Sequence, residues 1–165
     1  MRISVIYDTK TGNTKKAAEF IVKGIKEVNG MDAKAFNITN VDDEYAKTSQ
    51  GIIIGSPTYS AYLTARMKTW LEDNLKPLNV AGKLGGAFAT ANYVHGGGEL
   101  TMQCILTHEM VKGMMVYSGG GAYGVPVIHL GPVALGEKLD EFEELFVIYG
   151  KRFAMQTISV FSEKK

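Results

Sequence analysis

One polar stretch near the start of the chain has the composition of a phosphate-binding loop. It consists of Thr9, Lys10, Thr11, Gly12, Asn13 and Thr14. The stretch precedes a predicted helix, so backbone amides, hydroxyls and the helix dipole can converge on a phosphate dianion without a metal. It lacks the Gly-Lys pair of a Walker loop and the three glycines of a dinucleotide loop, which makes ATP and NAD poor candidates here. Taken alone, the same residues are equally typical of a turn followed by a helix N-cap.

Two later stretches add aromatic and glycine residues. The second stretch consists of Pro57, Thr58, Tyr59 and Ser60, and the third contains Thr90, Ala91, Asn92, Tyr93, His95, Gly96, Gly97 and Gly98. A tyrosine held beside a proline could stack on a flat conjugated ring, and successive glycines allow the backbone to approach a ligand closely. The alternatives are a proline turn with a surface tyrosine and a flexible connection into the helix that Glu99 begins.

These stretches separate segments whose hydrophobic period alternates. Short apolar runs predict strands over 3–7, 33–37, 51–55 and 84–90, and a fifth strand split into 113–117 and 125–129 by a glycine-rich insert at 118–124. Apolar residues at helical spacing predict helices between them, near 14–28, 41–47, 63–71 and 99–111 and from 135 onward. Five β-α repeats without a linker predict one domain, 1–165, with a doubly wound, three-layer α/β fold around a five-stranded parallel sheet.

The predicted fold also predicts where a ligand would bind. In an open parallel sheet, ligands bind beyond the carboxyl ends of the strands, at the point where the strand order reverses. The loops after the first and third strands flank that point in the five-strand order. We therefore expect the stretches at 9–14, 57–60 and 90–98 to form one site.

Overall charge and cysteine content exclude several classes of function. Lys and Arg number 18 against 17 Asp and Glu, so nothing favours nucleic acid or an anionic membrane as a partner. With a single cysteine, Cys104, the chain cannot form an internal disulfide or hold an iron-sulfur cluster by itself, and its three histidines are scattered, so no metal site is expected. A reducing cytoplasm fits this composition, and we expect neither a signal peptide nor a membrane span.

The three loops together resemble those of the flavodoxin-like FMN proteins. Residues 9–14 resemble the phosphate loop of that family, and Gly55–Tyr59 resembles its second flavin loop. The runs His95–Glu99 and Gly120–Gly124 resemble the branch of tryptophan-repressor-binding-type NAD(P)H:quinone oxidoreductases. Because the phosphate loop has the threonine-rich form of ordinary flavodoxins, the sequence lies between the two groups.

This resemblance implies a role for each loop. Residues 9–14 would hold the FMN phosphate, Pro57–Ser60 would pass along the ring, and Thr90–Tyr93 with Gly96–Gly98 would hold the polar edge of the ring. Tyr59 and Tyr93 would stack on its opposite faces. Backbone donors at the polar edge would stabilise the negative charge that a reduced flavin develops.

Two functions are compatible with such a site. In the first, NAD(P)H passes a hydride to the flavin, and a quinone-like acceptor then takes the electrons. In the second, the protein is a carrier that moves electrons between redox proteins, which recognise an acidic rim around the flavin edge. Neither Pro57–Arg66 nor Thr90–Gly98 contains a carboxylate, so the sequence favours the enzyme.

Two further features bear on the enzyme hypothesis. Histidine ionises near neutral pH, so His95 could protonate the acceptor or stabilise the reduced flavin, the alternative being an exposed loop residue without a chemical role. Met114, Met115 and the insert at 118–124 could form a subunit contact of a homo-oligomer at the flavin edge, the alternative for the methionines being core packing. The sequence leaves open whether NADH or NADPH is the donor and which acceptor is used.

Overall fold

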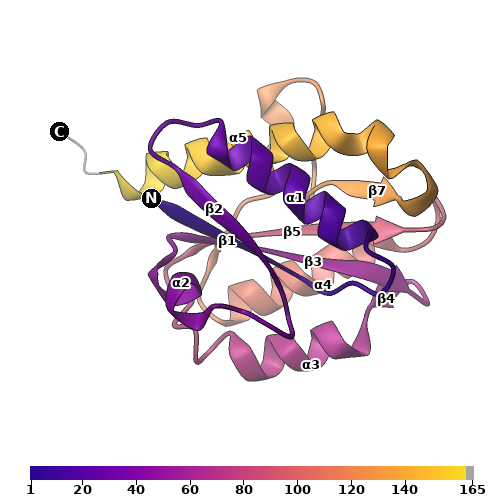
Figure 1. The fold of residues 1–165 in the computed structure, drawn as a ribbon, viewed down its shortest axis with the longest axis horizontal. Coiled ribbons are helices and arrows are strands. Elements are labelled where there is room, and N and C mark those ends of the chain that lie inside the picture. Colours follow the sequence, from indigo (N-terminus) through magenta and orange to yellow (C-terminus); the bar gives the residue numbers. More distant parts are fainter. Residues whose placement is uncertain (163–165) are drawn as a thin grey trace.

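A parallel sheet with helices on both sides forms the body of the protein (Figure 1). The computed structural model describes residues 1–162. The strands are β1 (Arg2–Tyr7), β2 (Asp32–Asn37), β3 (Gly51–Tyr59), β4 (Tyr62–Leu63), β5 (Leu84–Ala91), β6 (Met115–Val116) and β7 (Val133–Leu135). The helices are α1 (Asn13–Lys26), α2 (Asp43–Thr48), α3 (Ala65–Asn74), α4 (Gly98–Val111) and α5 (Glu143–Phe161), with 3-10 segments η1 (Gly121–Tyr123) and η2 (Gly136–Phe142).

The strand order is that of a doubly wound sheet. The strands follow the order β2-β1-β3-β5-β6 with parallel pairing throughout this path. The short β7 runs parallel to the end of β5, and β4 is antiparallel to the end of β3. Because the order reverses at β1 and β3, the loops that follow these two strands flank one point at the edge of the sheet. The predicted fold class is confirmed.

The apolar run of β3 is buried on both faces of the sheet, because consecutive side chains of a strand point to opposite sides. Ile53 packs in the layer with α1 and α5, whereas Ile52 and Ile54 pack in the layer with α3 and α4. Figure 1 shows these two helix pairs on opposite sides of the sheet. This burial on both sides fixes the register of the central strands and with it the place where each strand ends.

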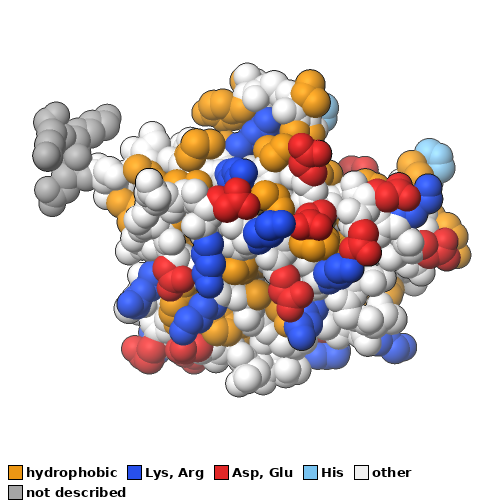
Figure 2. Space-filling view, turned by 45° about the horizontal axis from the view of Figure 1, so that its top comes forward, with side chains coloured by type: hydrophobic (Ala, Val, Ile, Leu, Met, Phe, Trp, Pro, Cys, Tyr) orange, Lys and Arg blue, Asp and Glu red, His pale blue; other side chains and the backbone are white. Residues whose placement is uncertain are grey.

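The two helices of one layer touch backbone to backbone. A Cβ atom on Gly24 of α1 would lie 2.0 Å from the carbonyl oxygen of Val147, and one on Gly150 of α5 would lie 2.3 Å from that of Ile21. Only glycine permits so close an approach at either position. Ion pairs reinforce the contact at the surface, where Lys23 Nζ lies 2.8 Å from Glu143 Oε1. Figure 2 shows basic and acidic side chains interspersed over the visible face.

The fifth strand differs from the prediction. Its first half is shorter than the predicted 113–117, because β6 spans only Met115–Val116. Its second half is β7, at Val133–Leu135, and not 125–129. The apolar run at 125–129 misled the prediction: Val125 is 91% exposed and Val127 is 56% exposed, so these side chains lie on the surface of an insert and not in the sheet.

One buried arginine organises that insert, which projects beyond α5 in Figure 1. Arg152 of α5 is 7% exposed and donates hydrogen bonds of 2.9–3.5 Å to five backbone carbonyls, those of Gly119, Gly120, Tyr123, Gly124 and Pro126. Carbonyl oxygens from a segment without regular pairing thereby find a donor. The glycine-rich insert is therefore held by a side chain about 30 residues further along the chain.

Two helix boundaries also move. Leu63 belongs to β4, and α3 begins two residues later, where the Thr64 hydroxyl caps the helix by accepting from the Met67 amide at 3.1 Å. The helix predicted from residue 135 onward begins as the 3-10 segment η2 and becomes α-helical at Glu143. No helix among residues 1–162 is both long enough and apolar enough to cross a membrane.

Candidate functional site

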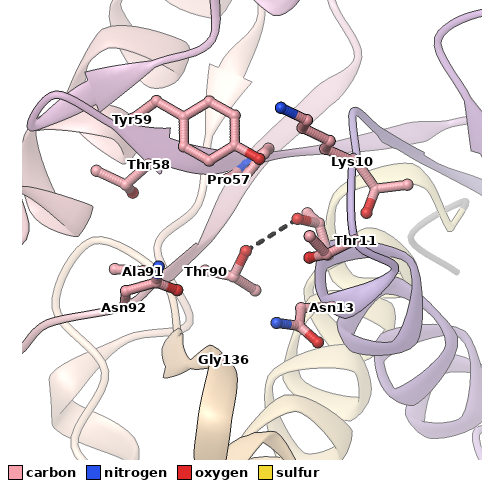
Figure 3. Close-up of a pocket in the computed structure, with 12 residues that line it drawn as sticks. Lys10, Thr11, Asn13, Pro57, Thr58, Tyr59, Thr90, Ala91, Asn92 and Gly136 are labelled. Carbon is pink, nitrogen blue, oxygen red and sulfur yellow. Dashed lines mark hydrogen bonds between the residues drawn. The ribbon is translucent and has the colours of Figure 1, made fainter.

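A narrow pocket lies beyond the carboxyl ends of β1, β3 and β5 (Figure 3). It is lined by Thr9, Lys10, Thr11, Asn13, Thr14, Pro57, Thr58, Tyr59, Thr90, Ala91, Asn92 and Gly136. The three predicted stretches thus meet at one place, as expected from the strand order. The pocket encloses about 60 Å³, several times the roughly 10–15 Å³ that one water molecule needs. That volume suits a small polar group such as a phosphate, with anything larger extending out of the pocket.

The loop at 9–14 presents free donors at the start of α1. Gly12 caps the helix in the left-handed conformation, with φ of 98°, and the first intrahelical bond runs from the Lys16 amide to the Gly12 carbonyl at 3.0 Å. The amides of residues 13–15 precede that bond and are the orphan donors that every helix has at its start. Together with the positive end of the helix dipole, they favour an anion at this position.

Other donors of the same loop are used internally. The Gly12 amide donates to the Thr9 hydroxyl oxygen at 3.0 Å, and the Thr9 amide donates to Asp8 Oδ1 at 2.9 Å. The Thr14 and Thr90 hydroxyls form a buried hydrogen bond of 2.9 Å, drawn dashed in Figure 3. This bond ties the start of α1 to the end of β5, so the loop at 9–14 is fixed to the strand that carries the third stretch.

Gly136 is the one lining residue that the sequence did not predict. It follows β7 directly, and a Cβ atom at this position would lie 2.5 Å from Asn13 Nδ2. A side chain here would therefore displace the Asn13 side chain. The misplaced fifth strand explains why the prediction missed Gly136: with the strand assigned to 125–129, residue 136 fell inside a predicted helix.

The second stretch forms a tight hairpin and not a loop. β3 continues through Tyr59, and Tyr59 pairs with Tyr62 of β4 across a two-residue turn. Ser60 and Ala61 have φ of 52° and 61°, the backbone that such turns require. Tyr59 is 44% exposed, so part of its ring is free to stack on a ligand. In Figure 3 the Tyr59 ring and Lys10 lie together on the side of the pocket away from Asn13.

The glycines of the third stretch make contacts within the protein. Gly97 has φ of 91°, and a Cβ atom there would lie 2.6 Å from the Ala61 carbonyl oxygen. A Cβ atom on Gly98 would lie 2.8 Å from the Val133 side chain. Close approach does explain both glycines, but the approaching groups are the hairpin and β7. Neither glycine lines the pocket, and the same holds for Gly96, Gly12 and Ser60.

Tyr93 and His95 lie further from the pocket. Tyr93 is 76% exposed, and His95 is also exposed; neither lines the pocket, so the predicted stacking of Tyr93 and the predicted chemical role of His95 stay predictions. Cys104 is buried on α4, where the Tyr62 hydroxyl donates to its Sγ at 2.8 Å. This bond raises the pKa of the Tyr62 hydroxyl, because the neutral phenol is the donor.

Charge at the site comes from three side chains. Lys10 is exposed on the phosphate loop, and Arg66 Nη2 lies 3.3 Å from the buried Asp8 carboxylate. The positive charge of Arg66 offsets the negative charge of Asp8, so the Asp8 carboxylate does not leave the pocket strongly negative. An anion that enters the pocket therefore meets helix amides and a lysine.

Comparison with known proteins agrees with this geometry. The Flavodoxin family profile matches residues 5–102, more than half of the chain. A flavodoxin from Clostridium saccharobutylicum is 42% identical over 161 residues, covering 98% of this chain and 100% of the relative. An NAD(P)H dehydrogenase (quinone) from Acidithiobacillus ferrooxidans is 26% identical over 168 residues, covering 79% and 84%.

Solved structures show the same fold. A flavodoxin from the domain Archaea superimposes with a TM-score of 0.79 at 23% identity, covering 95% of this chain and 99% of that one. The family profile spans the first two loops and reaches the start of α4, so it contains the three predicted stretches. The chain therefore belongs to the flavodoxin family of FMN-binding redox proteins, as its sequence predicted.

Proposed function

We propose that this protein is an electron carrier that holds one FMN and passes electrons between redox proteins. The observation that carries this proposal is the match to a flavodoxin along 98% of the chain at 42% identity. The quinone dehydrogenase relative matches at 26% over 79% of the chain. The family comparison thus favours the carrier over the enzyme that the missing acidic rim suggested.

The pocket fits the phosphate end of FMN. Its volume is that of a small polar group, and it is lined by Asn13 and Thr14 at the start of α1 and by Thr9 and Thr11 of the preceding loop. In this proposal donors of these residues bind the phosphate, and Lys10 adds a positive charge at the mouth. Neither a metal nor a second lysine is required for the dianion to bind.

The ring would lie outside the narrow pocket, along the hairpin. Tyr59 supplies an aromatic face, and the backbone of residues 90–92 supplies polar groups at the end of β5. The Thr58 hydroxyl is bonded to that of Thr101 at 3.1 Å, which ties the hairpin to α4. When bound, FMN supplies the redox chemistry by accepting and releasing electrons one or two at a time. The protein orients the ring, keeps water from one side and leaves an edge open to a partner.

An anaerobic experiment tests the proposal. FMN-loaded protein is mixed with NADH or NADPH, with and without a quinone, and the flavin absorbance is followed by stopped flow. A carrier shows no rapid bleaching with either nucleotide alone, whereas adding a flavodoxin reductase with its nucleotide bleaches the flavin, and cytochrome c restores it. Rapid bleaching by a nucleotide alone, reversed by the quinone, would instead establish the enzyme.

A further inference from the structure

Asp8 is a buried carboxylate between two of the loops that form the pocket. It follows β1 directly, its side chain is 4% exposed, and its amide donates to the Gly55 carbonyl of β3 at 3.1 Å. That backbone bond continues the sheet pairing for one residue beyond β1. The position of Asp8 is thus set by the sheet and not by the loop that follows it.

The carboxylate accepts from both neighbouring segments at once. Asp8 Oδ1 accepts from the Thr9 amide at 2.9 Å and lies 3.3 Å from Arg66 Nη2. Asp8 Oδ2 accepts from the Thr64 hydroxyl at 2.7 Å. Thr9 begins the phosphate loop, whereas Thr64 follows the hairpin and caps α3. A carboxylate suits this position, because its two oxygens can accept both hydrogen bonds while its charge pairs with Arg66.

Thr64 extends this connection into the hairpin. Its hydroxyl has a single proton, which it donates to Asp8, while its oxygen accepts from the Met67 amide at 3.1 Å. Its own amide donates to the Ser56 hydroxyl at 3.2 Å, and Ser56 in turn donates to the Pro57 carbonyl at 2.9 Å. A continuous chain of hydrogen bonds therefore runs from the first residue of the phosphate loop to the strand that carries Tyr59.

We propose that Asp8 is a positioning residue of the flavin site, whose carboxylate sets the phosphate loop at a fixed separation from the β3–β4 hairpin. This inference rests on the proposed FMN site. A ligand that carries both a phosphate and a ring must satisfy the two loops together, and loosening either loop reduces the bonds it can make at once. A buried negative charge so close to a phosphate site would otherwise oppose binding, and Arg66 offsets that charge.

The test compares FMN with riboflavin, which lacks the phosphate and so needs only the ring side of the site. Apoprotein is titrated with each flavin, and binding is followed by the loss of flavin fluorescence. The first variant is Asp8→Asn, which keeps the shape of the side chain but replaces one carboxylate oxygen with an NH2 group that donates. The other two variants are Thr64→Val and Thr64→Ser. Ser49→Ala is the control, because it removes a buried hydroxyl pair with Ser4 that lies outside the pocket.

The expected result is a change in the ratio of the two affinities. Asp8→Asn and Thr64→Val weaken FMN binding about tenfold or more, the loss typical of one hydrogen bond to a charged group, and change riboflavin binding less than about threefold. Thr64→Ser restores FMN affinity, and Ser49→Ala leaves the ratio unchanged. Circular dichroism of each apoprotein verifies the fold, and should Asp8→Asn not fold, the Thr64 pair carries the test.

Three outcomes would overturn the proposal. Equal weakening of both flavins would assign Asp8 to general support of the ring side, and unchanged affinities would assign it to the fold alone. Tighter FMN binding by Asp8→Asn would mean that the carboxylate acts through repulsion. Failure of the unaltered protein to bind either flavin would instead refute the proposed function, which keeps the two results apart.

Discussion

Buried polar groups near the two ends of β5 differ in their hydrogen-bond partners. At the carboxyl end, the Thr90 hydroxyl is bonded to Thr14, and the nearby Asp8 carboxylate accepts two hydrogen bonds and forms an ion pair with Arg66. At the amino end, the Glu109 carboxylate and the Tyr149 hydroxyl are fully buried, and neither has a well-formed hydrogen bond within residues 1–162. Buried polar groups alone therefore do not mark the functional end of a sheet, and their hydrogen-bond partners must be examined one by one.

A glycine pair brings the two unpartnered groups to the sheet. Gly85 and Gly86 face opposite layers: a Cβ atom on Gly85 would lie 2.6 Å from Glu109 Oε2, and one on Gly86 would lie 2.4 Å from the Tyr149 hydroxyl. Burial raises the pKa of Glu109 well above its ordinary value, an effect that the Gly86 amide only partly offsets. Burial and the neighbouring Glu109 likewise raise the pKa of Tyr149. Burial therefore disfavours the charged form of each group.

The largest effect is expected from Gly12→Val, at the carboxyl end. A Cβ atom at Gly12 meets no described atom within 4 Å, so the obstacle is the left-handed backbone, which β-branched residues adopt least readily. We expect FMN affinity to fall about a hundredfold, since the amides of α1 would be redirected. Gly12→Asn is the matched control, because asparagine tolerates this conformation. Full FMN occupancy in a normally folded Gly12→Val protein would show that the phosphate site is misassigned.

At the amino end, Glu109→Met should stabilise the protein. An apolar side chain of similar length removes two buried oxygens without partners, which is worth about 1–3 kcal/mol in the free energy of unfolding. Urea unfolding of the apoprotein measures the change, and FMN affinity should stay the same because Glu109 does not line the pocket. A loss of stability would mean that the carboxyl makes a bond that the geometry does not reveal.

Tyr59→Ala tests the ring side of the site. Loss of one aromatic face should weaken FMN binding about threefold to tenfold, as expected for stacking worth about 0.5–1.5 kcal/mol. Tyr59→Phe keeps the face and should bind as the unaltered protein does. Riboflavin should lose the same factor as FMN, unlike the phosphate-specific loss expected for Asp8→Asn. If the alanine variant binds both flavins normally, the ring lies elsewhere.

A fourth prediction concerns pH. Since burial raises the pKa of Glu109 in the folded state, the folded protein keeps a proton that the unfolded chain releases above its ordinary pKa of 4.5. This contribution to stability is full below that pH and declines as the pH rises toward the raised pKa. Glu109→Gln cannot titrate, so the difference in stability between it and the unaltered protein should grow from pH 4 to pH 7, at about 1.4 kcal/mol per pH unit at most. If the difference in stability did not change with pH, the pKa of Glu109 would be the same in the folded and the unfolded protein.

Most of the site was predictable because the carboxyl ends of parallel strands share one edge. Residues 9–14, 57–59 and 90–92 follow or end three central strands, so recognising those strands was enough to bring them together. Gly97 and Gly98 lie close to Ala61 and Val133, contacts within the protein that the sequence did not predict, and their role toward a ligand stays a prediction. Which backbone lies opposite a glycine depends on the packing of distant loops, and no local pattern of residues encodes it.

The sequence by itself determined the alternation of strands and helices, which follows from the local hydrophobic period. The doubly wound order that such repeats adopt then predicted which loops meet where the order reverses. Only the tertiary structure decided that the fifth strand resumes at Val133, that Gly136 closes the pocket and that Asp8 bonds to Thr64. These depend on contacts between residues far apart in the chain. An apolar run such as 125–129 is compatible with a strand or with an irregular insert, and here the segment forms part of the insert whose carbonyls, that of Pro126 among them, accept from Arg152.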